Sequence, residues 1–329
     1  MSRLGVSFTD PTLEARVQAG VEQVEVQLAA AVDSPEKFVA EAAAHLLNAG
    51  GKRFRPLLVM LSAEFGESAN PDVVRSAVVV ELTHLATLYH DDVMDEADKR
   101  RGAPSANARW DNSVAILVGD YLFAQASDLV SDLGPEAVRI QARTFSRLVQ
   151  GQIRETLGPS EDDDALAHYL SVVADKTGSL IATAALFGAK MAGASVDVQE
   201  TLSEFGERIG AAFQLSDDII DIASETGDSG KTPGTDLREG VPTLPTLIAL
   251  RSTDAESERL RSLLAKPLTD DAELDEAIRL LRVHPAMTEA RTYVQAEADA
   301  ASALLAKLPD VPARAALQAL CDTVATRLG

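Results

Sequence analysis

Two short acidic clusters hold the residues best suited to chemistry. They share one spacing, with three aspartates each: Asp91, Asp92 and Asp95 in LYHDDVMDEADKRRG, and Asp217, Asp218 and Asp221 in FQLSDDIIDIA. On a helix, carboxylates at positions i and i+4 lie one turn apart on the same face, where they can share a hard cation. Magnesium is usually held in this way, by one or two carboxylates with water and phosphate oxygens in the other positions.

A single cluster of this kind is also typical of a solvated helix end. Two of them in apolar, helical surroundings are harder to explain in that way, because like charges brought together raise carboxyl pKa values or need a counter-ion. A divalent metal between two helices removes this conflict. We therefore predict that all six aspartates bind metal.

Cations accompany both clusters in short segments. They are Arg100 and Arg101 directly after the first cluster, Lys52, Arg53 and Arg55 in GGKRFRP, Lys176 beside Thr177 in ADKTG, and Lys231 in SGKTPG after the second cluster. Any one of them alone is typical of a solvent-exposed charge. Together with six carboxylates, they predict sites for metal-bound and metal-free diphosphate.

The elements that position these residues are predicted to be helices. Apolar residues recur every three or four positions over 11–32, 72–95, 112–133, 136–157, 166–191, 197–224, 243–253, 258–265, 271–282, 286–306 and 312–327. We recognise no alternating strand and no repeat of fixed period. The prediction is an all-α fold of ten or more helices, in one domain over residues 1–329.

Charge and composition exclude several classes of protein. The net charge of −21 argues against nucleic acid or an anionic membrane surface as the main partner. Cys321 is the only cysteine, so an intrachain disulfide is excluded. The first residues lack the apolar core of a signal peptide, and no uninterrupted run approaches about 18 apolar residues. We expect a cytoplasmic protein with no membrane span.

The motifs resemble those of the trans-isoprenyl diphosphate synthases, or polyprenyl synthetases, over essentially the whole chain. They occur in the family's order: GGKRFRP, LYHDDVMDEADKRRG, the Gly151–Gln152 pair, KTG, FQLSDDIID and GKTPGTDLREGVPTLP. The resemblance implies helices around a central cavity, a homodimer and three magnesium ions. It also implies head-to-tail condensation of isopentenyl diphosphate onto an allylic diphosphate, with pyrophosphate itself taking the proton that is lost.

The resemblance also implies a role for each matched residue. The aspartates would hold magnesium; Arg100, Lys176 and Lys231 would contact the allylic diphosphate; Lys52, Arg55, His84 and Arg101 would bind isopentenyl diphosphate; Thr177 and Gln214 would present oxygens to the allylic cation. A lone histidine such as His84 is otherwise typical of a satisfied core position. One departure is Val241, where the family often has a lysine, which predicts somewhat weaker allylic binding.

The helix that carries Asp91 allows a prediction of product length. Each helical turn rises about 5.4 Å, which is close to the length of one extended isoprene unit. The small residues Ala86, Thr87 and Thr83 leave the first turns open, which predicts a product of about C30 to C50 for a quinone side chain. Such a product could need a membrane or carrier for release. The side chains of Tyr121, Leu122 and Phe123 could instead close this path for the growing chain, and the product would then be geranylgeranyl or farnesyl diphosphate.

Three rival functions are considered. A class I terpene cyclase also ionises allylic diphosphates, but it usually carries a mixed Asn/Ser/Glu second motif in place of Asp217–Asp221. A non-catalytic subunit of a heteromeric synthase would be expected to have lost carboxylates or cations. A helical scaffold with acidic patches leaves the cations unexplained.

Overall fold

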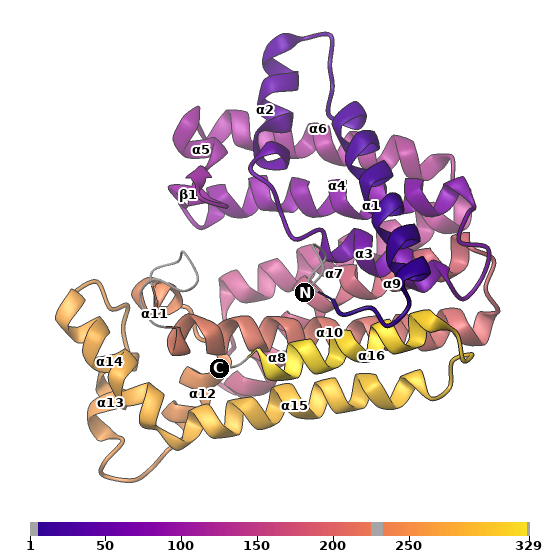
Figure 1. Ribbon diagram of the computed structural model, residues 1–329. Helices are drawn as coiled ribbons and strands as arrows, with labels where there is room; N and C mark the ends of the chain where they lie inside the picture. The colour runs from indigo at the N-terminus through magenta and orange to yellow at the C-terminus, as the bar shows by residue number, and fades with distance from the viewer. Residues whose placement is uncertain (1–5, 225–232, 328–329) are drawn as a thin grey trace. The chain divides into compact units, whose positions relative to one another are not determined.

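The computed structural model describes residues 6–224 and 233–327, and its secondary structure is almost entirely helical (Figure 1). In chain order the elements are α1 (Pro11–Ala31), α2 (Lys37–Asn48), α3 (Phe54–Ala63), α4 (Pro71–Met94), β1 (Lys99–Arg100), β2 (Ala103–Pro104), α5 (Ala106–Arg109), α6 (Asn112–Ser131), α7 (Pro135–Leu157), α8 (Ala165–Val173), the π-helical turn η1 (Ala174–Gly178), α9 (Ser179–Met191), α10 (Val196–Ala223), α11 (Thr235–Glu239), α12 (Leu244–Leu250), α13 (Glu258–Leu264), α14 (Asp271–Val283), α15 (Pro285–Leu305) and α16 (Pro312–Thr326). The predicted all-α class is confirmed.

The chain divides into two compact units, each built from separate segments. Unit 1 holds the described residues up to Phe145 with Leu180–Ser203 and Lys307–Ala319. Unit 2 holds Ser146–Ser179, the described part of 204–306 and residues 320–327. Helices α7, α10 and α16 contribute to both units. The single domain over 1–329 therefore stays a prediction.

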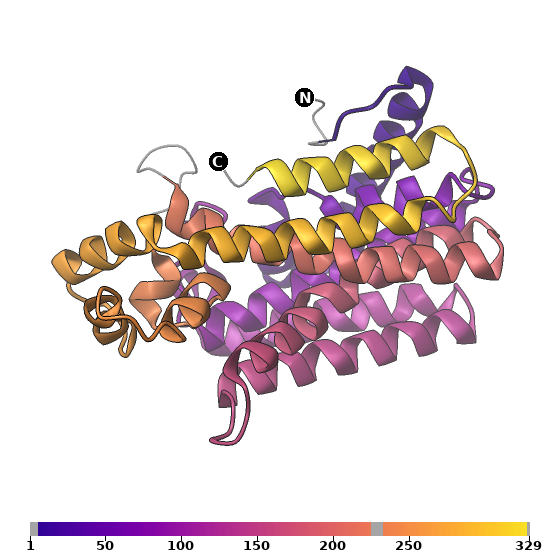
Figure 2. The ribbon, with the colours of Figure 1, turned by 90° about the horizontal axis from the view of Figure 1, so that it is seen from below.

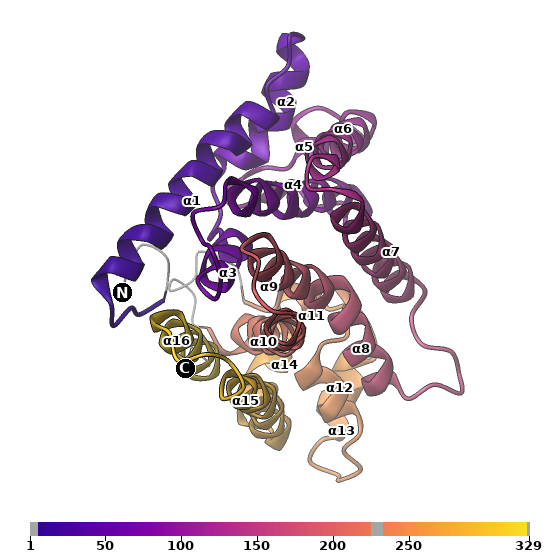
Figure 3. The ribbon, with the colours of Figure 1, turned by 90° about the vertical axis from the view of Figure 1, so that its right-hand side faces the viewer.

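Helix α4 lies at the centre of unit 1 and packs against α1, α3 and α6 (Figure 3). Its start is well defined, because the Asn70 side chain accepts a hydrogen bond from the Asp72 amide and Pro71 occupies the first turn. Its first five turns are buried almost all round, as expected of a central helix. Near its end the Tyr89 hydroxyl donates to the Ala42 carbonyl at 2.5 Å, which ties α4 to α2. This packing gives the first acidic cluster a rigid support.

Strands β1 and β2 form a small hairpin that the sequence did not predict. Lys99 pairs with Pro104 and Arg100 with Ala103 in antiparallel register. The two turn residues, Arg101 and Gly102, have φ angles of 54° and 78°. Left-handed conformations at both central positions characterise the type I′ turn, which suits the twist of a two-residue hairpin. Short paired strands of this kind leave no alternating pattern in the sequence.

Unit 2 contains the second half of α10 and the helices α12 to α15. Helix α15 packs against α12 and α14, and α13 against α14 (Figure 2). Asp270 caps α14 by accepting hydrogen bonds from two amides, and His284 caps α15 through Nδ1. The guanidinium of Arg282 donates to the carbonyls of Ile222 and Ser224, so it satisfies the C-terminal end of α10. That end carries the second acidic cluster.

Two stretches, Asn112–Ser131 and Ala165–Met191, are long and apolar enough to cross a membrane by length and composition. Neither stretch is an uninterrupted apolar run, because polar and charged residues occur in both. In the second stretch 61% of the apolar window is buried inside the protein, as in a core helix. In Asn112–Ser131, which is α6, only 33% of the apolar window is buried, and the helix exposes Ile116 and Leu117.

Candidate active site

The first acidic cluster lies at the C-terminal end of α4. The helix ends at Met94, Asp95 is its C-cap residue, and Asp91 lies one turn earlier. Asp92 is fully buried, Asp91 is partly buried and Asp95 is exposed. Because the carbonyl end of a helix carries partial negative charge, three carboxylates there favour binding of a cation. The cluster thus combines one fixed, buried carboxylate with two that solvent reaches.

The β1–β2 hairpin brings Arg100 back to this cluster. Its Nε donates to Asp92 Oδ1 at 2.6 Å, and its Nη2 lies 4.0 Å from Asp95 Oδ2. Burial raises the pKa of Asp92, although Arg100 opposes the shift. Within the described residues, the buried Oδ2 of Asp92 accepts no hydrogen bond. Asp92 therefore anchors Arg100 beside the cluster and keeps one oxygen available to a cation or water.

The second acidic cluster occupies the last turns of α10 in unit 2. Asp218 is buried and accepts hydrogen bonds from the Tyr169 hydroxyl and, at 3.1 Å, from Gln214 Nε2. Burial raises the pKa of Asp218 to about 6, against the effect of these two donors. Asp221 accepts from the amides of Thr235 and Asp236 at 3.4 Å each, so it also anchors the start of α11.

Two partners of this cluster were missed in the sequence. Arg327 donates to Asp217 Oδ1 at 2.7 Å and to the Phe213 carbonyl at 2.7 Å, and its guanidinium lies 4.1 Å from the centre of the Phe213 ring. Tyr169, on α8, donates to Asp218. Neither residue lies in a recognisable motif, and each is far from the aspartates in sequence. Only folding brings them together.

The η1 turn carries Lys176 and Thr177. Lys176 forms an ion pair with Glu155 on α7, and Thr177 Oγ1 donates to Gln214 Oε1 at 3.2 Å. The amide of Gln214 in turn donates to Asp218. Thr177 and Gln214, which were predicted together, therefore lie side by side and next to the second cluster.

The GGKRFRP segment contains two arginines with different surroundings. Arg53, with a left-handed φ of 48°, forms ion pairs with Glu25 and Glu81, which raise its pKa although burial opposes this. Arg55 differs, because its buried Nε has no hydrogen-bond partner among the described residues. Burial lowers the pKa of Arg55, Glu81 opposes this shift, and Arg101 adds to it. A buried donor of this kind needs an anionic or polar ligand.

Further cationic groups surround His84. Arg101 Nη1 donates to the Leu46 carbonyl at 2.9 Å and also to the Gly50 carbonyl. Burial, followed by repulsion from Arg55 and Arg101, holds the pKa of His84 well below its ordinary value. His84 is therefore neutral at physiological pH, so one of its ring nitrogens donates a hydrogen bond and the other accepts one. Lys52 is exposed.

A narrow cavity lies within unit 1, below the first cluster on α4. Its volume is about 10 Å³, and it is lined by Val79, Val80, Thr83, Gln141, Thr144, Leu180, Thr183 and Phe187. Gln141 donates to Thr83 at 3.2 Å, and the hydroxyls of Thr144 and Thr183 lie 2.6 Å apart. Ala86 and Thr87, one turn above Thr83, are both buried.

The residues considered as alternative blocks do not line this cavity. Tyr121 donates to the Asp33 carbonyl at 2.9 Å, and the Phe123 ring packs 4.3 Å from the Phe145 ring. Among the described residues, the aromatic side chain that lines the cavity is Phe187 on α9.

No group of three or more His, Cys, Asp or Glu side chains within residues 6–224 and 233–327 could by itself hold a metal ion. Magnesium does not require such a cage, because it keeps several waters and binds through one or two carboxylates plus substrate phosphates. The unpaired Oδ2 of Asp92 and the all-oxygen donor sets at both helix ends suit that chemistry. These residues therefore fit a magnesium that arrives with diphosphate.

Comparison with known proteins identifies the family. Residues 36–281 match the family model described as polyprenyl synthetase. The chain belongs to the polyprenyl synthetase family. It is 53% identical over 326 residues to nonaprenyl diphosphate synthase of Mycobacterium tuberculosis, covering 99% of this chain and 97% of that protein. It is 38% identical to heptaprenyl diphosphate synthase component 2 of Geobacillus stearothermophilus, covering 92% of this chain and 94% of that protein.

A solved structure from another organism shares the fold. The crystal structure of geranylgeranyl pyrophosphate synthase from Corynebacterium glutamicum, complexed with calcium and isoprenyl diphosphate, superposes with a TM-score of 0.89 at 48% identity. The superposition covers 98% of this chain and 100% of the chain of the Corynebacterium glutamicum protein. Among the residues expected for this family, Lys231 lies outside the described residues. Val241 lies between α11 and α12 with 37% of its surface exposed, so it supplies no charge there.

Proposed function

We propose that this polyprenyl synthetase is an all-trans polyprenyl diphosphate synthase that condenses isopentenyl diphosphate onto an allylic diphosphate with magnesium. One observation carries the proposal most strongly: each of the two acidic clusters lies at the C-terminal end of a long helix, with a guanidinium held against it. Carboxylates with adjoining cations suit a metal–diphosphate complex better than a structural ion pair.

Asp91, Asp92 and Asp95 would hold magnesium on one side of the allylic diphosphate. Asp217, with Asp218 and Asp221, would hold it on the other. Three ions are expected from the family resemblance. When bound, magnesium neutralises the charge that develops on the departing diphosphate.

The cations complete the diphosphate site. Arg100, oriented by Asp92, would contact the allylic diphosphate, as would Lys176 and Lys231. Thr177 and Gln214 would direct oxygens toward the allylic cation, and their mutual hydrogen bond orients them. Apolar side chains around the tail would exclude water, which would otherwise trap the cation. The chain's contribution is thus positioning and electrostatic stabilisation.

Isopentenyl diphosphate would bind at the group formed by Lys52, Arg55, His84 and Arg101. Replacing Arg55 with methionine is expected to raise the KM for isopentenyl diphosphate about 10- to 100-fold, because charge-assisted hydrogen bonds contribute about 1.5–3 kcal/mol each. The thermal midpoint should not fall, since the change removes a poorly solvated charge. Steady-state kinetics with each substrate varied in turn would measure this.

Arg75→Met is the matched control. Arg75 lies on α4, the helix that carries His84, and it forms surface ion pairs with Asp72 and Asp132. An unchanged KM for isopentenyl diphosphate in Arg55→Met would show that Arg55 does not bind it.

We further propose a product of about C30 to C50, because small residues follow the first acidic cluster down α4. Ala86, Thr87 and Thr83 lead toward the narrow cavity. For the isoprene chain to grow past Thr83, the hydrogen bond from Gln141 to Thr83 must break. If it does not, the product would be geranylgeranyl or farnesyl diphosphate.

The assay that tests this function uses the purified chain, magnesium, farnesyl diphosphate and labelled isopentenyl diphosphate. We expect labelled all-trans products, resolved by chain length on reversed-phase chromatography after dephosphorylation. Cyclic hydrocarbon without label would instead show a terpene cyclase. No product from the chain alone, with activity restored by a partner subunit, would show a component of a heteromeric synthase.

We propose a cytoplasmic homodimer. The apolar side chains of Ile116 and Leu117 on α6 are exposed, and a second copy would cover them.

A further inference from the structure

The η1 turn interrupts what the sequence predicts as one continuous helix over 166–191. It separates α8 from α9 and carries the two predicted active-site residues Lys176 and Thr177. In a π-helical turn each backbone hydrogen bond spans five residues, instead of four as in the α-helix around it. Such turns are rare and occur frequently at functional sites. Specific contacts are therefore needed to keep this turn in place.

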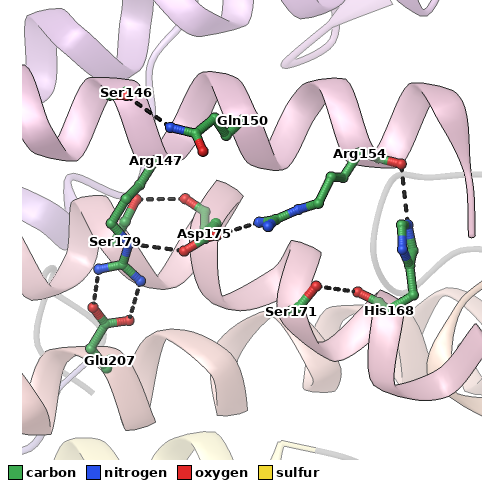
Figure 4. A network of polar contacts seen from close by, with 9 residues as sticks. All are labelled: Ser146, Arg147, Gln150, Arg154, His168, Ser171, Asp175, Ser179 and Glu207. Atoms are coloured by element: carbon green, nitrogen blue, oxygen red, sulfur yellow. Dashed lines mark hydrogen bonds and ion pairs between the residues drawn. The ribbon is translucent and has the colours of Figure 1, made fainter. Parts of the chain in front are cut away.

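Asp175, within the turn, is held by two arginines of α7 (Figure 4). Arg147 Nε donates to Asp175 Oδ1 at 2.8 Å, and Arg154 Nη2 donates to Asp175 Oδ2. Both carboxylate oxygens are thus engaged by separate residues of one helix. Although partial burial opposes ionisation, the bonds from Arg154 and Arg147 lower the pKa of Asp175, so the carboxylate is charged at neutral pH.

Arg147 also joins the turn to α10. Its Nη1 and Nη2 donate to the two carboxylate oxygens of Glu207 at 2.5 and 3.3 Å (Figure 4). Because the planar guanidinium bonds two carboxylates at once, it fixes their mutual orientation. One side chain thereby links α7, η1 and α10.

The backbones of α7 and η1 are in close contact at Gly151. A Cβ atom at this position would lie 2.8 Å from the Lys176 amide nitrogen and 3.2 Å from the Asp175 carbonyl carbon. Only glycine allows this approach. On the other side, a Cβ at Gly178 would lie 3.1 Å from Glu207 Oε2. The turn is therefore confined on two sides as well as held by ion pairs.

The held turn is connected to the second acidic cluster. From Thr177 the hydrogen bonds continue to Gln214 and then to Asp218. A shift of the turn would move Lys176 and Thr177 and would break this connection.

We propose that Asp175, held by Arg147 and Arg154, is a positioning residue that keeps the η1 turn in the geometry that presents Lys176 and Thr177 to the allylic diphosphate. This inference rests on the proposed function. Asp175 itself touches neither substrate nor metal, and it acts through the turn that it anchors.

The test replaces Asp175 with asparagine, which has the same shape but no charge. We expect kcat to fall about 10- to 100-fold, because a small misplacement of catalytic groups has an effect of that size. The KM for isopentenyl diphosphate should stay unchanged, since its proposed site on α3, α4 and the hairpin is untouched. Asp175→Glu, which keeps the charge, should recover part of kcat.

Hydrogen exchange supplies a readout independent of activity. Amides of 173–179 should exchange faster in Asp175→Asn than in the unmodified chain, with exchange elsewhere in α10 and α15 unchanged. Glu276→Gln is the matched control, because it breaks the bidentate ion pair with Arg259 on exposed helices of unit 2. That control should alter neither kcat nor exchange in the turn.

The outcomes separate this inference from the proposed function. The positioning role is wrong, and the proposed synthase function is unaffected, if the unmodified protein elongates its allylic substrate and Asp175→Asn has the same kcat. The same holds if hydrogen exchange accelerates in Asp175→Asn with no change in kcat. If the unmodified chain does not elongate, the proposed function fails first. Should Asp175→Asn not fold, Arg154→Met removes one of the two bonds and should give a smaller loss of kcat; an unaltered kcat there would equally overturn the role.

Discussion

Replacing Asp91 with alanine is expected to lower kcat by about 100-fold or more while the protein stays folded. Asp91 lies one turn before the C-terminus of α4, where the carbonyl end of the helix already favours a cation. Loss of a carboxylate that holds magnesium against the leaving diphosphate should remove about 3 kcal/mol of transition-state stabilisation. Single-turnover assays over a range of magnesium concentrations would measure this. The magnesium concentration for half-maximal rate should also rise.

Asp217→Ala should produce a loss of the same order, because it removes a carboxylate from the second cluster. It also frees Arg327, so its folding needs separate measurement by circular dichroism. Asp98→Ala is the matched control, since this exposed carboxylate follows the first cluster but lies outside its spacing. Near-native rates in Asp91→Ala or Asp217→Ala would refute the metal-binding role.

Replacing Ala86 with phenylalanine is expected to shorten the main product to about C15 to C20. Ala86 is fully buried one turn below Asp91, and each turn of α4 corresponds to about one isoprene unit. A phenyl ring there would stop the growing tail near the top of the path. Chromatography of dephosphorylated products would show the change, and the condensation rate for the first additions should be maintained.

Stability distinguishes an open path from close packing at this position. If Ala86 faces a path for the tail, the ring occupies that space at little cost. If Ala86 is close-packed against another helix, the larger side chain should destabilise the protein by about 1–3 kcal/mol. Ala86→Ser keeps the size and should leave the product unchanged. A stable Ala86→Phe variant with the original product distribution would contradict the path along α4.

Most long helices follow directly from apolar spacing. The stretches predicted over 72–95 and 197–224 appear as α4 and α10 with ends shifted by only one residue. The helices α2 and α3 were not predicted, because α3 is apolar on all sides and α2 is short with loop residues at both ends. Periodicity carries little information in such segments.

The η1 turn and the hairpin escaped prediction for a different reason. The segment 166–191 has one uninterrupted helical pattern, and the wide turn within it depends on Asp175 meeting arginines more than 20 residues earlier. The hairpin depends on Arg101 taking a left-handed conformation that an arginine adopts rarely. Long-range contacts decide both, and local sequence does not contain them.

The candidate site was predicted by residue type and spacing but not by role. The sequence does not distinguish the roles of Arg53 and Arg55. Only the fold brings Glu25 and Glu81 to Arg53, and it leaves the buried Nε of Arg55 without a hydrogen-bond partner among the described residues. For the same reason Tyr169 and Arg327 had no signal in the sequence. Motifs identify the chemistry, and packing then assigns each charge to structure or to substrate.

We propose that both acidic clusters hold one metal–diphosphate complex. A crystal structure of the chain with magnesium and an uncleavable thio analogue of farnesyl diphosphate would test this. We predict that carboxylate oxygens of Asp91 and of Asp217 lie about 2.0–2.1 Å from magnesium ions that share the same diphosphate. Metal and diphosphate bound at one cluster alone, with the other cluster still paired to its arginine, would show that the two clusters do not share a metal–diphosphate complex.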